Sequence, residues 1–177
     1  TTAVVLAAAL GAEHCEICSD VDGVFSADPR VVESAQQIPE LPLDGALALA
    51  ESGAKILLAD ALAHAKALGV TLRAASTAKA SGTGTRLPPG PTPEAVVGIA
   101  GDDQLRAVLQ DPDGPVLPWP GAARAWVPVP EGTRVLVDMR NLPDPSTWDL
   151  PQGLTDQGPA ATVSAIGRVV VSDPAIV

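Results

Sequence analysis

The stretch Ser19-Asp20-Val21-Asp22-Gly23-Val24-Phe25-Ser26-Ala27-Asp28-Pro29-Arg30 decides how the first half of the chain is organised. It follows a short apolar run at residues 14–18, which predicts a buried strand. Because Asp, Gly and Pro favour turns, the stretch itself predicts a loop at the carboxyl end of that strand. Ligands of α/β sheets bind beside such loops. The residues alone leave two interpretations open, a binding loop and a solvated acidic loop.

Helix-forming segments alternate with short apolar strands across this half. Residues 1–11 are rich in Ala and Leu, begin with two Thr that can cap a helix, and end at a Gly. Asp44 can cap a second helix that runs to residue 51, and a third helix is expected over residues 58–68. Residues 70–75 predict another strand. This alternation predicts an α/β layer with a parallel sheet and helices.

A proline-rich segment at residues 88–94 separates this half from the rest. It cannot continue a helix or a central strand, so it predicts a linker between a domain at residues 1–87 and a second one at 95–177. Short apolar segments beyond it predict a small, mostly β module. The expected strands are residues 95–100, 105–110, 123–129, 134–139 and 162–171, with a long surface loop over 141–159 and one helix candidate near 159–164.

Composition excludes some classes of partner. The 177 residues are 46% hydrophobic, so the chain can bury a sizeable core. The formal net charge of −10 argues against nucleic acid and against an anionic membrane, because both bind basic patches. It does not exclude ATP, which backbone N–H groups, a few cations and Mg²⁺ can hold. With no signal peptide and no apolar run long enough to span a bilayer, we expect a cytoplasmic location.

The two cysteines, Cys15 and Cys18, form a C-x-x-C pair, a spacing found in redox and metal sites. Both fall on the first expected strand, where positions three apart point to opposite faces. No second pair completes a zinc site, so we predict no metal site and interpret both as small core residues.

Three blocks resemble the carboxyl-terminal part of the amino-acid kinase domain of aspartate kinases, and together they cover residues 1–87. Residues 1–12 are similar to the family's S-D-T-T-A-x-x-L-A-A-x-L-x-A helix, beginning at its first Thr. Residues 19–30 are similar to T-D-V-D-G-V-Y-T-A-D-P-R, and residues 53–57 to G-A-K-V-L. The resemblance implies the carboxyl-terminal half of an amino-acid kinase fold.

The same resemblance implies a nucleotide site and a reaction. The family transfers the γ-phosphoryl group of MgATP to the β-carboxylate of aspartate, so ATP and Mg²⁺ are the implied cofactors. We expect Asp20 and Arg30 to face one cleft, with Phe25 covering the base. Thr1 and Thr2 follow the position of the family's acceptor-binding Ser-Asp, which implies that they bind substrate. The implied nucleotide-binding residues are Ser19, Asp20, Phe25, Arg30, Lys55 and Ile56.

Other parts of the family pattern are not in this sequence. Neither the K-F-G-G-T motif nor the Ser-Asp before Thr1 occurs in it, so catalytic residues cannot be assigned. We expect an amino-terminal kinase fragment, or a homo-oligomer, to complete the molecule, and we interpret Thr1 as a processed or cleaved end. Residues 95–100 and 161–167 are similar to strands of ACT regulatory domains, but no P-G-x-A effector loop is recognisable. This implies one degenerate ACT-like module.

Three functions are compatible with these observations. The first is an aspartate-kinase-type phosphotransferase, and the second is a non-catalytic relative used for binding or assembly. The third is a hydrolase that uses Thr1 as an amino-terminal nucleophile. The third requires Thr1 at the edge of a strand, whereas the sequence after it predicts a helix. Sequence upstream of Thr1 would separate the first two.

Overall fold

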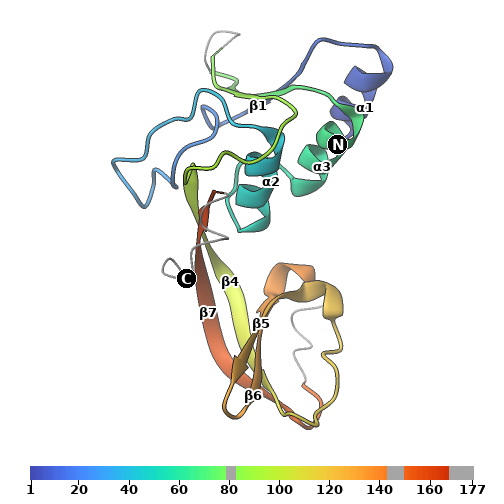
Figure 1. The fold of residues 1–177 in the computed structure, drawn as a ribbon, viewed down its shortest axis with the longest axis vertical. Helices are drawn as coiled ribbons and strands as arrows, with labels where there is room; N and C mark the ends of the chain where they lie inside the picture. The colour runs from blue at the N-terminus through green and yellow to red at the C-terminus, as the bar shows by residue number, and fades with distance from the viewer. Residues whose placement is uncertain (79–82, 143–149, 168–177) are drawn as a thin grey trace. The chain divides into compact units, whose positions relative to one another are not determined.

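The computed structural model describes residues 1–78, 83–142 and 150–167. The chain divides into two compact units, one formed by residues 1–101 with 163–177 and the other by residues 102–162. We call them unit 1 and unit 2 and describe each by itself (Figure 1). The units divide after Gly101, beyond the expected linker at 88–94; the domain limits 1–87, 88–94 and 95–177 stay a prediction.

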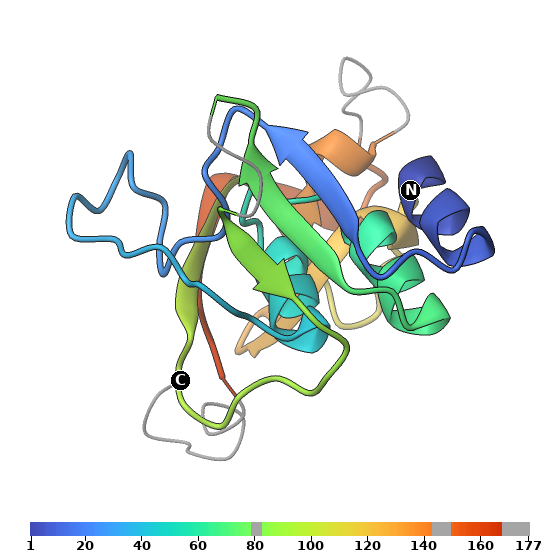
Figure 2. The same ribbon diagram turned by 90° about the horizontal axis from the view of Figure 1, so that it is seen from above.

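Unit 1 is built on a three-stranded sheet. Strands β1 (Cys15–Ser19) and β2 (Leu72–Ser76) run parallel, with Cys15 opposite Leu72 and Ser19 opposite Ser76. A third strand, β3 (Thr85–Leu87), pairs antiparallel with β2 and gives the order β1-β2-β3 (Figure 2). The parallel pair confirms the predicted α/β class. The sequence predicts no strand at β3, because three residues are too few to show a periodic pattern.

Three helices pack against this sheet: α1 (Thr2–Ala9), α2 (Leu43–Glu51) and α3 (Ala59–Leu68). The core is built mainly from Leu, Ala and Val side chains. Gly69 ends α3 with φ at 67°, the left-handed conformation that favours glycine. The predicted side-chain caps are wrong. Thr1 makes no side-chain capping hydrogen bond. The N-cap of α2 is Pro42, and Asp44 lies within the first turn of the helix, where its negative charge interacts favourably with the helix dipole.

The prediction of a buried first strand is wrong in part. Only Cys15 of β1 is buried, because β1 lies at the edge of the described sheet. Cys18 is exposed, which corrects its interpretation as a core residue. Strands of parallel sheets are buried on both sides only where both faces are covered. Cys15 is buried in the core of unit 1, as expected, and this burial raises the pKa of its thiol.

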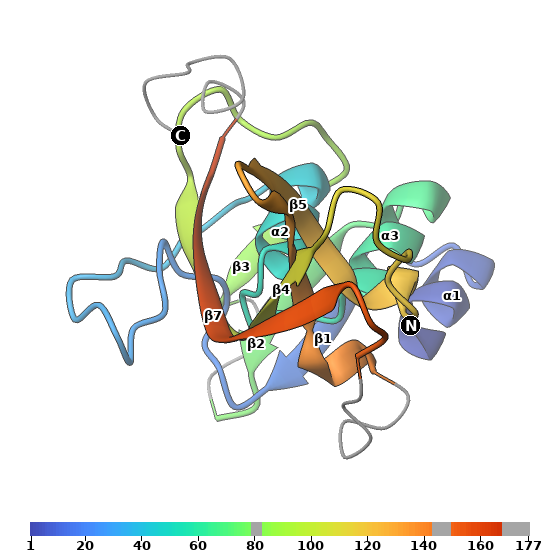
Figure 3. The same cartoon turned by 90° about the horizontal axis from the view of Figure 1, so that it is seen from below.

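Unit 2 contains most of a four-stranded sheet in the order β5-β6-β4-β7. Its strands are β4 (Gly98–Gln110), β5 (Ala123–Val129), β6 (Gly132–Asp138) and β7 (Leu154–Ile166), and β4 and β7 each extend into unit 1. Figure 3 shows β4, β5 and β7 of this sheet. Two 3-10 turns, η1 (Pro120–Ala122) and η2 (Met139–Asn141), accompany them. A second apolar core lies here, around Val108, Val135 and Val137. The predicted mostly β module is confirmed.

Strand β7 overturns two predictions. The expected surface loop at 141–159 is wrong from residue 154 onward, and the helix candidate near 159–164 is a strand. Gly and Pro are typical of loops, so the segment resembles one in sequence. However, β7 lies at a sheet edge, where one side of the strand needs no backbone N–H donor, so Pro is tolerated. Residues 143–149 of the expected loop and 168–171 of the expected last strand lie outside the described residues.

Four charged side chains meet at the end of β6. The side chain of Asp138 is 1% exposed and accepts hydrogen bonds from Arg140 Nε at 2.7 Å and Arg124 Nε at 2.9 Å. Arg140 also pairs with the buried carboxylate of Asp102. Burial alone would raise the pKa of Asp138, but the bonds from Arg140 and Arg124 outweigh it and hold that pKa at about 2. Sequence analysis did not identify this network.

Acid is expected to destabilise unit 2 through Asp138. Folding lowers its pKa from 3.8 to about 2. Its carboxylate therefore contributes stability that is complete above about pH 4 and is lost as the pH falls through about 2, a difference of about 2 kcal/mol. All three tryptophans, at positions 119, 126 and 148, fall within unit 2, so tryptophan fluorescence can follow its urea unfolding. An equal unfolding free energy at about pH 5 and about pH 2 would contradict this expectation.

None of the helices in the described ranges is long and apolar enough to cross a membrane.

Candidate functional site

The carboxyl ends of β1 and β2 lie side by side and carry hydroxyl side chains. Ser19 and Ser76 are register partners there. Ser19 Oγ accepts a hydrogen bond from the Val21 N–H at 3.1 Å. The Ser19 carbonyl accepts two more from Thr77, one from its N–H at 2.9 Å and one from its hydroxyl at 3.1 Å. The chain therefore turns directly after β1. This confirms the predicted loop over residues 19–30, in the position where α/β sheets bind ligands.

The loop and the chain that returns from it form a two-stranded arm. The Ser26 N–H donates to the Gln36 carbonyl and the Ile38 N–H to the Val24 carbonyl, both at 2.8 Å. Phe25 forms an isolated antiparallel bridge with Gln37 between these two bonds. Its ring is half-buried, so one part of it stays accessible to a ligand.

Arg30 is held in a fixed orientation by Asp28. Its Nε donates to Asp28 Oδ1 at 3.0 Å and its Nη2 to Oδ2 at 2.7 Å, and its backbone N–H donates to Oδ1 at 2.9 Å. These side-chain and backbone bonds, with a smaller attraction from Lys55, lower the pKa of Asp28 to about 2. The same fork raises the pKa of Arg30, to which the charge of Asp20 adds. The guanidinium is thus a permanent cation whose Nη1 is directed away from the fork.

Lys55 comes from a different loop, between α2 and α3. Gly53 turns the chain there with φ at 103°, and the Ile56 N–H donates to the Ala54 carbonyl at 3.0 Å. Ile56 packs against the core of unit 1, while Lys55 is exposed. Within the described residues Lys55 makes no ion pair, yet its charge reaches Asp28. Arg30 therefore pairs with Asp28 directly, while Lys55, from a separate loop, adds only a weak attraction to the same carboxylate.

Thr1 and Thr2 begin α1 and are exposed. Their side chains make no hydrogen bond to the loop residues Ser19, Asp20 or Arg30 in the part of the chain that the structure describes. The structure thus pairs Arg30 with Asp28, and the charges of Asp20 and Lys55 act weakly on Arg30 and on Asp28, respectively, but within the described residues no hydrogen bond or ion pair joins Thr1 or Thr2 to this pair. The role of Thr1 and Thr2 in acceptor binding stays a prediction.

This arrangement suits a polyanionic ligand with a flat base. Arg30 and Lys55 can attract phosphate oxygens, and Phe25 can stack on a ring. In the described ranges no three His, Cys, Asp or Glu side chains are grouped to hold a metal ion. Mg²⁺ is normally held by phosphates and only one or two carboxylates, so these residues fit a nucleotide that brings its own Mg²⁺.

Thr85, a buried residue on β3, is a functional candidate that no local sequence pattern marks. Its Oγ1 accepts a hydrogen bond from the Val24 N–H at 2.8 Å and donates one to the Ile38 carbonyl at 2.6 Å. Thr85 and Val24 are 61 residues apart in the sequence. No local pattern relates positions so far apart, and Asp28 was likewise recognisable only as one acidic residue among several.

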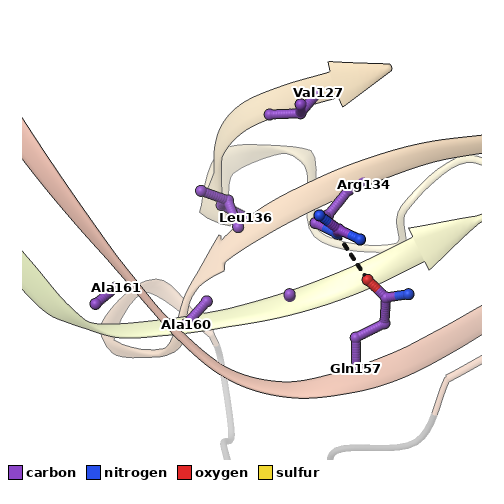
Figure 4. Close-up of a pocket in the computed structure, with 7 residues that line it drawn as sticks. Val127, Arg134, Leu136, Gln157, Ala160 and Ala161 are labelled. Atoms are coloured by element: carbon purple, nitrogen blue, oxygen red, sulfur yellow. Dashed lines mark hydrogen bonds between the residues drawn. The ribbon is translucent and has the colours of Figure 1, made fainter. Parts of the chain in front are cut away.

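A shallow depression on unit 2 is a separate feature (Figure 4). Arg134 Nε donates to Gln157 Oε1 across it at 2.8 Å. Small and aliphatic side chains form its other walls: Ala107, Val127, Leu136, Ala160 and Ala161. None of the predicted nucleotide- or substrate-binding residues lines it.

Known proteins resemble this chain in both sequence and fold. Residues 1–74 match the model of the amino acid kinase family. An aspartokinase of Corynebacterium efficiens is 52% identical over 77 residues, which are 44% of this chain and 18% of that protein. An aspartokinase of Bacillus sp. strain MGA3 is 42% identical over 111 residues, which are 61% of this chain and 27% of that protein. The chain therefore spans less than a third of the length of these curated relatives.

The solved structures agree on the fold. E. coli aspartokinase III, in complex with aspartate and ADP, superposes with a TM-score of 0.76 at 23% identity. The match covers 98% of this chain and 44% of that one. Such a likeness extends the shared fold beyond residues 1–74 into the β module.

Proposed function

Because the chain belongs to the aspartate kinase family, we propose that it supplies the nucleotide-binding half of an ATP-dependent phosphotransferase that acts on L-aspartate. The product of this reaction is 4-phospho-aspartate. The γ-phosphoryl group moves to a β-carboxylate oxygen of aspartate, and ADP leaves. Catalysis of this kind depends mainly on positioning and on neutralising charge on the phosphoryl oxygens.

One observation supports this proposal above the others, the orientation of Arg30 by Asp28 in the predicted nucleotide loop, with the exposed cation Lys55 on a second loop. The fork with Asp28 uses Nε and Nη2 of Arg30 and leaves Nη1 to donate to a phosphate oxygen. Lys55, exposed and without an ion pair in the described part of the chain, can donate to a second oxygen. A phosphate chain would thus be bound by two cations that different loops supply.

The other predicted residues have roles at the base and ribose. Half-buried Phe25 covers one face of the adenine, and Asp20 accepts from the base or ribose edge. Ser19 already uses its hydroxyl to hold the turn at Val21, so its contribution is to orient Asp20. Ile56 packs against the core and keeps Lys55 in place. Mg²⁺, bound with the nucleotide, would neutralise phosphate charge that two cations leave unpaired.

We propose that binding of the aspartate acceptor requires family motifs that do not occur in these 177 residues. The family's K-F-G-G-T and Ser-Asp motifs belong to the amino-terminal half of the kinase domain, which we propose must be joined or bound to this half for catalysis. Thr1 and Thr2 would then adjoin the bound aspartate. Residues 95–177 would form a degenerate ACT-like module, and the complete molecule would act in amino-acid biosynthesis in the cytoplasm.

Replacing Lys55 with Gln is expected to weaken nucleotide binding. A lost charge-assisted hydrogen bond to phosphate should raise the Kd for ADP with Mg²⁺ at least tenfold, or about 1.4 kcal/mol. Isothermal titration calorimetry on the 177-residue chain measures this. Lys66→Gln is the matched control, because it removes the same charge from α3, where Lys66 pairs with Asp44 at 2.9 Å. Its Kd should equal that of the unsubstituted chain.

Two outcomes would contradict the proposal. If the unsubstituted chain binds neither ADP nor ATP at millimolar concentration, it does not contain a nucleotide site. If Lys55→Gln and Lys66→Gln weaken binding equally, binding reflects overall charge and not this site. Nucleotide binding without phosphorylation of aspartate, after the amino-terminal half has been added, would favour the non-catalytic relative instead.

A further inference from the structure

We propose that Thr85 is a positioning residue for the nucleotide, acting through the arm that carries Phe25, Asp28 and Arg30. This inference rests on the proposed function above. The hydroxyl of Thr85 connects β3 to both strands of the arm, so it determines where the arm leaves the sheet. Thr85 itself touches no ligand in this scheme.

The hydroxyl of Thr85 both accepts and donates a hydrogen bond. Oγ1 accepts from the Val24 N–H at 2.8 Å, one residue before Phe25. It donates to the Ile38 carbonyl at 2.6 Å, on the returning strand. Thr85 and Val24 are both 0% exposed, so no water can replace these partners. A single buried hydroxyl therefore fixes the two strands of the arm relative to β3.

Gly23 allows the loop to approach Thr85 this closely because it has no side chain. Its φ of 131° lies in the region that favours glycine. A Cβ at this position would come within 2.7 Å of Thr85 Oγ1 and 2.9 Å of its backbone nitrogen. The loop backbone thus lies directly on Thr85, and any side chain at residue 23 would push the arm away from β3.

A second contact holds the same part of the arm from the solvent side. Gln37 Nε2 donates to the Asp22 carbonyl at 2.5 Å. Most other residues between 20 and 37 are exposed, so few apolar contacts hold the arm in place. Loss of either contact should let the arm move without removing any ligand-binding side chain. The cations and ring would then meet the nucleotide in a less ordered geometry.

The test compares three variants by calorimetry with ADP and Mg²⁺ and by hydrogen exchange. Thr85→Val keeps the shape and removes the hydroxyl, so we expect the Kd to rise about tenfold and amide exchange to increase over residues 20–38. Thr85→Ser restores the hydroxyl and should bring the Kd back to within about twofold of the original. Gln37→Ala, an exposed change that leaves the core intact, should raise the Kd about threefold. Circular dichroism confirms that each variant is folded at the temperature used.

Several results would overturn this inference. One is an unchanged Kd for Thr85→Val in a folded protein. Another is a Thr85→Ser variant as weak as Thr85→Val, because packing and not the hydroxyl would then matter. If Thr85→Val does not fold, the Gln37→Ala variant provides the test. An unchanged Kd and an unchanged exchange pattern in Gln37→Ala would then contradict the inference. Each of these presupposes that the unsubstituted chain binds ADP, whereas failure of that binding overturns the proposed function itself.

Discussion

Replacing Asp138 with Asn is expected to lower the free energy of unfolding of unit 2 by about 3 kcal/mol. Asp138 is 0% exposed and is the shared acceptor of Arg124 and Arg140. An Asn amide would direct N–H donors at guanidinium donors and leave two positive charges without their central carboxylate. Both Arg side chains are partly exposed and can turn toward water, which keeps the expected loss near the lower end for a broken buried pair.

Tryptophan fluorescence during urea unfolding measures this loss, because all three tryptophans fall within unit 2. Asp156→Asn is the matched control. Asp156 pairs with Arg106 at 2.5 Å, and its side chain is 28% exposed against 1% for Asp138, so a broken pair should cost no more than about 1 kcal/mol. If the two substitutions lower the free energy of unfolding equally, burial does not make the Asp138 network contribute more to stability than a more exposed ion pair. The acid-dependent loss of stability between about pH 4 and pH 2 should also disappear in Asp138→Asn.

Replacing Gly84 with Ala is expected to destabilise unit 1 by at least about 3 kcal/mol. Gly84 has φ at 100°, and a Cβ there would overlap the carbonyl oxygen of Ala74 on β2. The overlap is with backbone, so no side chain can move aside to relieve it. Separation of β3 from β2 would follow, and with it displacement of Thr85 from the arm.

Far-ultraviolet circular dichroism reports this change, since α1, α2 and α3 all lie in unit 1. Gly69→Ala is the control. Gly69 also has positive φ, at 67°, but nothing lies within 4 Å of its added Cβ, so only the backbone strain of about 1 kcal/mol is expected. A Gly84→Ala variant as stable as Gly69→Ala would contradict the predicted clash. Tryptophan fluorescence should show unit 2 unaffected if the damage is confined to unit 1.

Local chemistry was sufficient for the features that a short segment decides by itself. The turn-forming residues after β1 predicted the loop at 19–30, and Gly69 predicted the end of α3. The alternation of helices and strands predicted a parallel pair, which β1 and β2 form. Propensity and periodicity act over a few residues, so they are visible without the fold.

Pairing between distant segments was not visible in the same way. Strand β3 is three residues long and exists because β2 offers it a partner, and β7 contains Gly158 and Pro159 yet is a strand because it lies at a sheet edge. Cys18 became exposed because β1 lies at the edge of the described sheet. In each case the neighbour, and not the segment's own composition, determined the outcome.

The sequence by itself identified the residues that we propose bind a nucleotide, because the loop motif, Arg30 and Lys55 are recognisable as residue types in a known order. Only the tertiary structure decided that Thr85 holds the arm and that Arg124 and Arg140 meet at Asp138. The physical reason is that hydrogen bonds and charge interactions depend on distances of a few ångströms between groups. Such distances arise between residues far apart in the sequence only when the strands and helices that carry them pack together.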